Sequence, residues 1–405
     1  MGYTGTQRGS DVKEQQRVHS GLLALVLAVV LGLTACSGGT DTSSEEPDAP
    51  ERPPAPAATV VAEPVNGAQS VAPRDPVRVT VNDGTIQSVA LTNPEGEKVK
   101  GTLSEDKKSW TVAEPLGYSK TYTWSGNAVG SDGRQVPITG SFTTVTPDAT
   151  LGASSNVGDG KTYGIAMPIA ISFDAPVANK AAVEKALDVR TTPKTQGSWA
   201  WLENDTSVHW RPKEYWRPGT KVSVTANIYG VELSDGVYGA NDLTVDFSIG
   251  RSQIVKANTQ THRMVVIRDG KQVADYPVSF GLDSDPGRVT RSGTHVVMSK
   301  HSTYFMNNPG YGYEDFEVNW AVRISNNGEF THAAPWSVSD QGVRNVSHGC
   351  LNLSPENAKE YYDSALMGDP VEITGSSQQL GPRDGDYHDW TYSWQEWTAK
   401  SALSQ

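Results

Sequence analysis

The hexapeptide Ser347-His348-Gly349-Cys350-Leu351-Asn352 holds one of only two cysteines in the chain. The thiolate is the nucleophilic form of cysteine, and a nearby base or positive charge promotes its formation. Gly349 permits a tight turn with backbone angles that other residues avoid, and such a turn can aim amide groups at a developing oxyanion. The hexapeptide therefore predicts a nucleophile that is carried on a sharp turn.

A candidate base lies upstream, at His332 in Phe330-Thr331-His332-Ala333-Ala334-Pro335-Trp336. A Cys and a His that are distant in sequence but meet in space are the usual pair of a cysteine acyltransferase. A metal site that uses His332, His348 and Cys350 is an alternative, because catalytic zinc takes three protein ligands. No second cluster of acids or histidines in the sequence supports that alternative.

Composition limits the remaining possibilities. A chain of 405 residues predicts two to four domains, and 37% hydrophobic with 20% charged residues is typical of a soluble globular protein. The net charge of −12 argues against nucleic acid as a partner, because phosphate binding requires a basic surface. Two cysteines cannot build a disulfide framework, so we expect Cys350 to be a free thiol.

The first 35 residues read as a signal peptide. Basic residues precede a continuous apolar run at 21–33, which is shorter than the roughly 20 residues that a helix needs to span a bilayer. The run ends at Leu33-Thr34-Ala35-Cys36, where the small residues and the Cys predict cleavage before Cys36 and its lipidation. An ordinary signal peptide with a coincidental Cys is the alternative. Residues 36–70 are rich in Pro and Glu and predict a disordered tether.

Two similar β-domains follow, at 71–147 and 148–250. Short runs of alternating apolar and polar residues, separated by turn residues, predict antiparallel strands, and each segment has the size of a β-sandwich. We expect a short helix at 182–187 in the second domain. The domains are interpreted as spacers, with wall binding or protein binding as the alternative. The turn at Glu232, Asp235 and Gly236 offers two carboxylates and a carbonyl to a cation, although a lone acidic turn is usually only solvated.

The third domain, at 251–375, begins with a predicted hairpin whose tight turn is Asp269-Gly270. Residues 299–319 are rich in Gly, Asn and Tyr and predict a mobile loop. Ser354-Pro355-Glu356 predicts the start of a helix that runs to about Leu366, and a last strand is expected at 371–373.

The tail, residues 376–405, carries Trp390, Trp394 and Trp397. Their spacing would place them on one helical face, and we expect this face to pack on the catalytic domain.

The distal His332 followed by Ser-His-Gly-Cys, an aliphatic residue and Asn resembles the catalytic domain of YkuD-type L,D-transpeptidases. The whole chain resembles the mycobacterial lipoprotein type. The resemblance implies a mainly β fold, in which two immunoglobulin-like β-sandwich domains precede a β-rich catalytic domain with a short helix after the nucleophile. The family often has Pro where this chain has Arg291, a departure that we expect to affect a turn and not the chemistry.

The resemblance also implies an activity. A tetrapeptide stem of peptidoglycan would donate an acyl group to Cys350, and the amine of a diaminopimelate on another stem would accept it, which gives a 3→3 cross-link. No cofactor is required, and carbapenems are expected as covalent inhibitors. Alternatives are an L,D-carboxypeptidase on the same scaffold and a non-enzymatic wall-binding lipoprotein. Lipid on Cys36 would hold the exported protein at the outer face of the cell membrane, in the cell-wall space.

Site roles follow from the same resemblance. Cys350 is the expected nucleophile and His332 the proton acceptor and donor, with the backbone carbonyl of Ala333 orienting the ring. His348 and Gly349 are placed in the oxyanion region. The stretch at 299–319 falls where the family places a lid over the donor site. The expected substrate contacts are Tyr313 on this lid, Asn327, Gly328, Trp336, Ser347 and Asn352.

Overall fold

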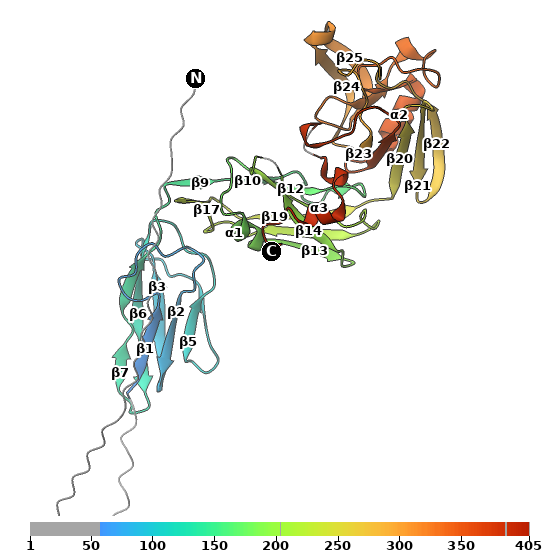
Figure 1. Cartoon of the computed structure of the whole chain (residues 1–405). Coiled ribbons are helices and arrows are strands. Elements are labelled where there is room, and N and C mark those ends of the chain that lie inside the picture. The colour runs from blue at the N-terminus through green and yellow to red at the C-terminus, as the bar shows by residue number, and fades with distance from the viewer. Residues whose placement is uncertain (1–56, 203, 385–386, 405) are drawn as a thin grey trace, which may run out of the picture. The chain divides into compact units, whose positions relative to one another are not determined.

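The computed structural model describes residues 57–202, 204–384 and 387–404 (Figure 1). These residues form three groups of β-sheets, in chain order, with few and short helices. Cys36, the apolar run at 21–33 and most of the tether lie outside the described residues. None of the helices in the described part of the chain has the length and apolar character that crossing a membrane requires.

The first domain is a sandwich of two antiparallel sheets. One sheet has the order β1-β2-β5-β4, with bounds Thr59–Glu63, Arg78–Asn82, Ser109–Val112 and Gly101–Leu103. The other joins β3 (Gly84–Thr92) to β6 (Thr121–Gly130), which also pairs with β7 (Gln135–Pro137) and β8 (Gly140–Thr143). The buried rings of Trp110 and Trp124 meet edge to face at 5.4 Å inside this domain.

The tether prediction was wrong at its C-terminal end, because β1 lies within the predicted range 36–70. All five residues of Thr59–Glu63 pair with β2 in antiparallel register, from Thr59 with Asn82 to Glu63 with Arg78. The segment TVVAE is apolar at its centre and can therefore extend the sheet as an edge strand.

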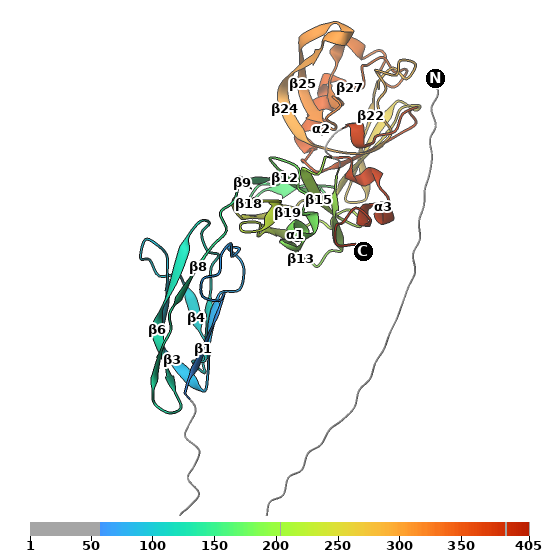
Figure 2. The same cartoon turned by 60° about the vertical axis from the view of Figure 1, so that its left-hand side comes forward.

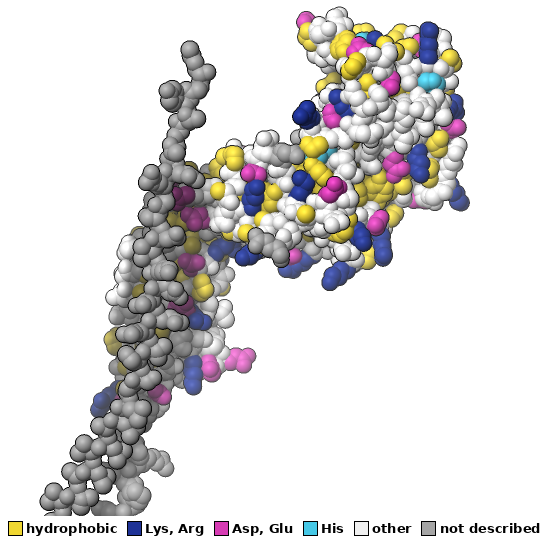
Figure 3. All heavy atoms as spheres, in the orientation of Figure 1, with side chains coloured by type: hydrophobic (Ala, Val, Ile, Leu, Met, Phe, Trp, Pro, Cys, Tyr) yellow, Lys and Arg dark blue, Asp and Glu magenta, His cyan; other side chains and the backbone are white. Residues whose placement is uncertain are grey.

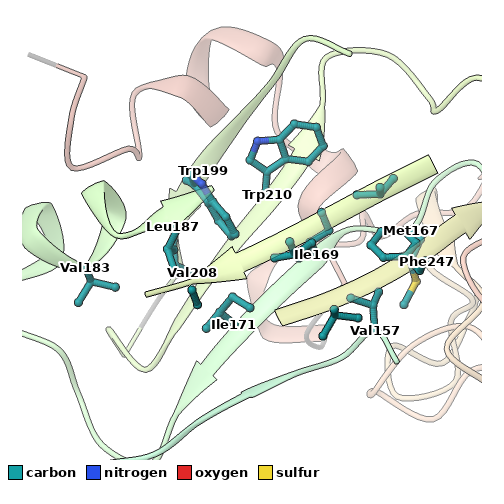
Figure 4. Packing of buried hydrophobic residues seen from close by; sticks show 14 of the residues in the cluster. Val157, Met167, Ile169, Ile171, Val183, Leu187, Trp199, Val208, Trp210 and Phe247 are labelled. Carbon is teal, nitrogen blue, oxygen red and sulfur yellow. The ribbon is translucent and has the colours of Figure 1, made fainter. Parts of the chain in front are cut away.

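The second domain has the same plan. Strands β10, β12, β15 and β14 form one sheet, with bounds Ala153–Ser155, Ile169–Phe173, Ser207–Pro212 and Gly197–Trp201. Strands β11, β19, β16 and β13 form the facing sheet, with bounds Thr162–Tyr163, Leu243–Ile249, Lys221–Ala226 and Leu187–Thr192. A small third sheet contains β17 (Glu232–Ser234), β18 (Val237–Gly239) and β9 (Ala149–Leu151), and the expected helix is α1, Lys180–Lys185. Figure 4 shows Ile169, Ile171, Val208 and Phe247 in the packed interior of this domain.

A glycine and a tryptophan mark the structural repeat between the two domains. A Cβ added to Gly101 would lie 2.0 Å from the Trp110 ring, and one added to Gly197 would lie 1.9 Å from the Trp210 ring. In both domains the glycine therefore lets the indole lie flat across the neighbouring strand. This shared packing is a closer match between the domains than their sequences suggest.

The third domain contains two sheets on one hydrophobic core. The first has the order β22-β21-β20-β28-β23, with bounds Lys271–Pro277, Arg263–Arg268, Gln253–Asn258, Pro370–Thr374 and Gly293–Val296. The second has the order β24-β25-β26-β27, with bounds Ser299–Asn308, Tyr313–Arg323, Phe330–Ala333 and Leu351–Leu353. Figure 2 shows β24, β25 and β27 together, with α2 (Pro355–Ser364) beside them. The predicted hairpin at Asp269-Gly270 and the predicted last strand are both present as β21–β22 and β28.

Helix α2 begins where the sequence predicts. The Ser354 hydroxyl accepts the amide of Asn357 at 3.2 Å, and Pro355 occupies the first helical position. The buried residues Ala358 and Tyr361 pack into the core that both sheets share. Helix α2 therefore fixes the strand before it, β27, against the domain core.

The predicted mobile loop at 299–319 is instead a long β-hairpin. Strands β24 and β25 pair from Ser299 with Arg323 to Asn308 with Tyr313, and the connection is the short 3-10 turn η1, Pro309–Tyr311. The Gly, Asn and Tyr residues that suggested a loop gather at this turn, where Gly312 has φ +78°. The β-branched and aromatic residues on either side of the turn form the paired strands.

The tail follows the third domain through η3, Pro382–Asp384. Its tryptophans then pack on the second domain, so the prediction that they pack on the catalytic domain was wrong. In α3, Trp394–Thr398, the Trp397 indole donates to Ser198 O at 2.9 Å; in η4, Asp389–Thr391, the Trp390 indole donates to Ala166 O at 2.8 Å. The guanidinium of Arg211, whose residue is only 2% exposed, lies 4.6–5.5 Å from the rings of Trp390, Trp394 and Trp397. A buried cation needs such partners, and the sequence spacing could not reveal it.

Candidate active site

Two parallel strands bring the predicted base and nucleophile together. Strands β26 and β27 pair with His332 opposite Asn352, and Cys350 is the residue that precedes β27. Both side chains are largely buried, with Cys350 8% and His332 3% exposed. They line one cavity of about 330 Å³.

The backbone around the nucleophile is held by hydroxyl groups. Gly349 has φ +117°, which only glycine adopts readily. The Ser347 hydroxyl donates to Cys350 O at 2.6 Å and accepts the amide of Gly349 at 3.2 Å, while Thr290 Oγ1 donates to Gly349 O at 2.8 Å. Ser347 therefore stabilises the turn, and the Gly349 amide is already engaged in this state.

The imidazole of His332 is oriented by the chain itself. Its Nδ1 lies 2.8 Å from the carbonyl oxygen of Ala333. Because a carbonyl only accepts, we assign the ring proton to Nδ1, which leaves Nε2 with a lone pair. Burial lowers the pKa of His332 to about 4, although the Ala333 contact opposes this shift. The ring is therefore neutral at neutral pH and suited to accept a proton.

The thiol of Cys350 donates to Gly328 O at 3.6 Å. Burial raises the pKa of Cys350 to about 12, with a smaller rise from the charge of Glu329 and an opposing effect of the Phe330 backbone. The resting pair is thus a neutral thiol and a neutral imidazole. Thiolate forms only when the proton leaves for a base during attack.

Apolar side chains, most of them aromatic, line one side of the cavity. Met306, Tyr313 and Phe316 come from the β24–β25 hairpin, and Figure 3 shows hydrophobic side chains at the surface where this hairpin lies. Trp336, in η2 (Pro335–Ser337), is 53% exposed; its ring lies 6.0 Å from that of His332 and 5.0 Å from that of Phe316. This wall excludes water on one side and leaves an apolar surface for a ligand.

Of the other predicted contacts, His348 and Asn352 line the cavity, whereas Gly328 and Asn327 do not. The exposed His348 lines the same cavity, with its ring 5.5 Å from that of Tyr313, and Asn352 donates from Nδ2 to Ser337 Oγ at 3.1 Å. Gly328 meets Cys350 through its carbonyl. Asn327 does not line this cavity, and it donates its amide to Asp384 O in η3.

Several residues near the site were missed by sequence reasoning. Arg288 donates to Ser347 O at 3.1 Å and to Val346 O, which supports the turn from outside. Asp340 lines the cavity and pairs with Arg344 at 2.5 Å. Glu329 is buried directly before β26. The sequence offered no signal for them beyond their charge, because only the fold brings them to the site.

The acidic turn of the second domain holds no cluster of ligands. Glu232 Oε1 accepts the amide of Gly236 at 3.3 Å. No group of three or more His, Cys, Asp or Glu side chains able to hold a metal ion occurs in the described ranges. Cation binding at Glu232, Asp235 and Gly236 stays a prediction.

Comparison with known proteins agrees with this geometry. Residues 252–373 match the YkuD family, described as the L,D-transpeptidase catalytic domain, and residues 68–232 match the bacterial Ig domain family. L,D-transpeptidase 5 of Mycobacterium tuberculosis (strain ATCC 25618 / H37Rv) is 50% identical over 374 residues, which make up 92% of this chain and 82% of the relative. The chain belongs to the L,D-transpeptidase family.

Other members of the family align over different shares of this chain. L,D-transpeptidase 2 of Mycobacterium tuberculosis (strain CDC 1551 / Oshkosh) is 36% identical over 395 residues, which cover 94% of this chain and 95% of the relative. A solved structure of the LD transpeptidase LdtMt1 in complex with imipenem shares 35% identity over 55% of this chain and 99% of that chain, with a TM-score of 0.47. The immunoglobulin-like and YkuD-type fold class is confirmed, and the chain is an enzyme of a family that acylates through a catalytic cysteine.

Proposed function

We propose that this peptidoglycan L,D-transpeptidase forms 3→3 cross-links through Cys350, with His332 as its base. The observation that carries this assignment is the pairing of β26 with β27, which places a neutral imidazole and a buried thiol in one cavity. Cys350 is the only free cysteine of the described residues, so the sulfur chemistry of the family falls to it.

The reaction proceeds in two steps. Nε2 of His332 takes the thiol proton while the sulfur attacks the carbonyl carbon of the third residue of a tetrapeptide stem. The C–N bond to the terminal D-Ala breaks, and the leaving amine takes the proton back from the imidazolium. The amine of a diaminopimelate on a second stem then attacks the thioester and gives a proton to Nε2 of His332. The C–S bond breaks, and the imidazolium returns that proton to the sulfur, which restores the thiol.

The oxyanion of each tetrahedral intermediate needs donors. The Gly349 amide is held by Ser347 Oγ in the resting state, so we assign the first donor to the Cys350 amide and place His348 beside it. Tyr313 and Trp336 line the cavity where the donor stem would lie, and Asn352 is held there by Ser337. Carbapenems would acylate the same sulfur, as the complex of LdtMt1 with imipenem suggests.

The mechanism above uses side chains and backbone alone, so we propose that no cofactor is required. Activity that survives treatment with EDTA supports this proposal, and activity that is lost and then restored by a divalent metal overturns it.

The chemistry is tested with a synthetic tetrapeptide stem as donor and a second stem as acceptor. We expect D-Ala release together with a 3→3 dimer in the mass spectrum, and neither from the Cys350→Ala variant. Tripeptide without dimer, at saturating acceptor, would instead identify an L,D-carboxypeptidase.

The N-terminal sequence further supports a lipid anchor on Cys36 that holds the exported enzyme at the outer face of the cell membrane. The full-length protein should fractionate with membranes and gain the mass of lipid on Cys36. Cys36→Ala should release it, or leave it with an uncleaved signal peptide; an unlipidated wild-type protein contradicts the anchor.

A further inference from the structure

Glu329 is a buried carboxylate directly behind the nucleophile. It is 1% exposed and lies between Gly328, which accepts the Cys350 thiol, and Phe330 at the start of β26. A Cβ built on Gly349 would lie 3.7 Å from Glu329 Cγ, so the side chain runs beneath the turn that carries Cys350. Thiolate formation would therefore place a second negative charge close to an existing one.

A buried carboxylate requires compensation, because its isolated charge is strongly disfavoured in the protein interior. Oε2 of Glu329 accepts the Ser325 hydroxyl at 2.5 Å, and Oε1 accepts the Arg291 amide at 3.0 Å. The guanidinium Nη1 of Arg291 lies 3.5 Å from the same Oε1. The full positive charge that pairs with Glu329 is thus that of Arg291.

Arg291 is itself held on its other side. Its Nε lies 2.7 Å from Asp384 Oδ1 in η3, and its side chain is only 19% exposed. The buried ring of His295 also faces this network, with Nδ1 4.0 Å from Glu329 Oε2 and Nε2 2.9 Å from Arg291 O. Arg291 therefore reaches beyond its own turn, because its long side chain contacts the carboxylate behind Cys350.

We propose that Arg291 is a positioning residue for the nucleophile, which neutralises Glu329 and fixes the Gly328–Phe330 segment against Cys350. Without Arg291, the uncompensated Glu329 would oppose negative charge on the sulfur. The direction of this effect matches the raised pKa of Cys350, to which Glu329 contributes. The inference rests on the proposed role of Cys350 as the acylated residue.

Other charged or titratable groups also face the Cys350 sulfur and influence its reactivity. His332, His348, Tyr313 and Asp340 line its cavity, and Arg288 holds the carbonyls of the preceding turn. The substitutions below leave all of them in place. A change in the acylation rate that depends on both Arg291 and Glu329 therefore belongs to this pair.

The test measures the rate at which imipenem acylates Cys350, by intact mass, between pH 6 and 9. The set contains wild type, Arg291→Met, Glu329→Gln and the double variant. Arg263→Met is the matched control, because Arg263 pairs with Asp275 at 2.8 Å far from the sulfur in sequence, and both side chains are 39% exposed. We expect imipenem to acylate Arg291→Met about tenfold more slowly across this range, because an unpaired Glu329 then opposes the negative charge that develops on the sulfur during attack.

The double variant distinguishes an electrostatic role of Arg291 from a purely structural one. If Arg291 acts by neutralising Glu329, removal of both charges restores the rate to within about threefold of wild type. A double variant that stays as slow as Arg291→Met overturns the proposal, and so does an Arg291→Met rate equal to that of Arg263→Met. If Arg291→Met does not fold, the same comparison is made between Arg291→Gln, Arg291→Gln with Glu329→Gln, and wild type. A wild-type protein that imipenem leaves unmodified would instead contradict the proposed function.

Discussion

The Cys350 thiol donates to the backbone carbonyl of Gly328 across 3.6 Å, in the cavity that it shares with the imidazole of His332. The Gly328 carbonyl accepts the hydrogen bond of the resting thiol, so the sulfur stays protonated and neutral in the free enzyme. Burial of both partners, and not an ion pair between them, is the dominant cause of this neutral state. Substrate must therefore be present before the proton is transferred.

The neutral resting state predicts slow reaction with simple reagents. Because the pKa of Cys350 is raised to about 12 by burial, alkylation by iodoacetamide should be slow at pH 7 and rise steadily towards pH 10. A plateau of alkylation below pH 8 would show a thiolate in the free enzyme and contradict this view. Free cysteine under the same conditions is the reference.

Replacement of His332 by Gln should lower the rate of acylation by about 100- to 10,000-fold, which is the usual contribution of a general base. Ala333→Ser is the matched control, because it keeps the backbone carbonyl that Nδ1 contacts at 2.8 Å. Its rate should stay within about threefold of wild type, which is less than about 1 kcal/mol. A large loss in Ala333→Ser would show that the carbonyl geometry is not what orients the ring.

Burial of His332 also links stability to pH. Its folded pKa of about 4 lies below the ordinary value of 6.5, so the unfolded chain binds more protons between these limits. The contribution to stability is therefore present above about pH 6.5 and is lost as the pH falls towards 4. Urea unfolding at pH 7 and pH 5 should show a smaller difference in His332→Gln than in wild type, and an equal difference would contradict the shift.

The pairing of Cys350 with His332 could be predicted from the sequence. The motif around Cys350 is local, and only the pairing of two strands is needed to bring it to His332. The turn at Asp269-Gly270 and the cap at Ser354 were also readable, since both depend on adjacent residues. The Arg291–Glu329 contact was not, because it joins residues 38 apart through side chains. The Gly-, Asn- and Tyr-rich stretch at 299–319 was wrongly predicted to be a loop, because its turn residues lie only at the tip of the β24–β25 hairpin.

The contact between Arg211 and the three tail tryptophans predicts a large effect on stability. Arg211→Met leaves the Tyr392 carbonyl without the donor that now lies at 2.8 Å and removes a cation from between aromatic rings. We expect a loss of about 2–4 kcal/mol in the free energy of unfolding. Arg190→Met is the control, because that side chain is exposed and its ion pair is worth about 1 kcal/mol or less. Equal stabilities of the two variants would contradict the assigned role.

The repeated glycine–tryptophan packing predicts that Gly197→Ala destabilises the second domain. An added Cβ would lie 1.9 Å from the Trp210 ring, which must then shift, and overpacking of this kind costs about 1–3 kcal/mol. Gly381→Ala is the matched control, since its Cβ would meet nothing within 4 Å. Thermal unfolding separates the two, and an unchanged melting temperature in Gly197→Ala would show that the ring moves freely.

The role of Cys350 as the nucleophile is tested by the intact mass of the protein after exposure to imipenem, followed by mapping of the modified peptide. We expect one adduct, on Cys350, which disappears in Cys350→Ala and forms much more slowly in His332→Gln. An unmodified wild-type protein, or an adduct that persists in Cys350→Ala, would contradict the assignment of this sulfur as the nucleophile.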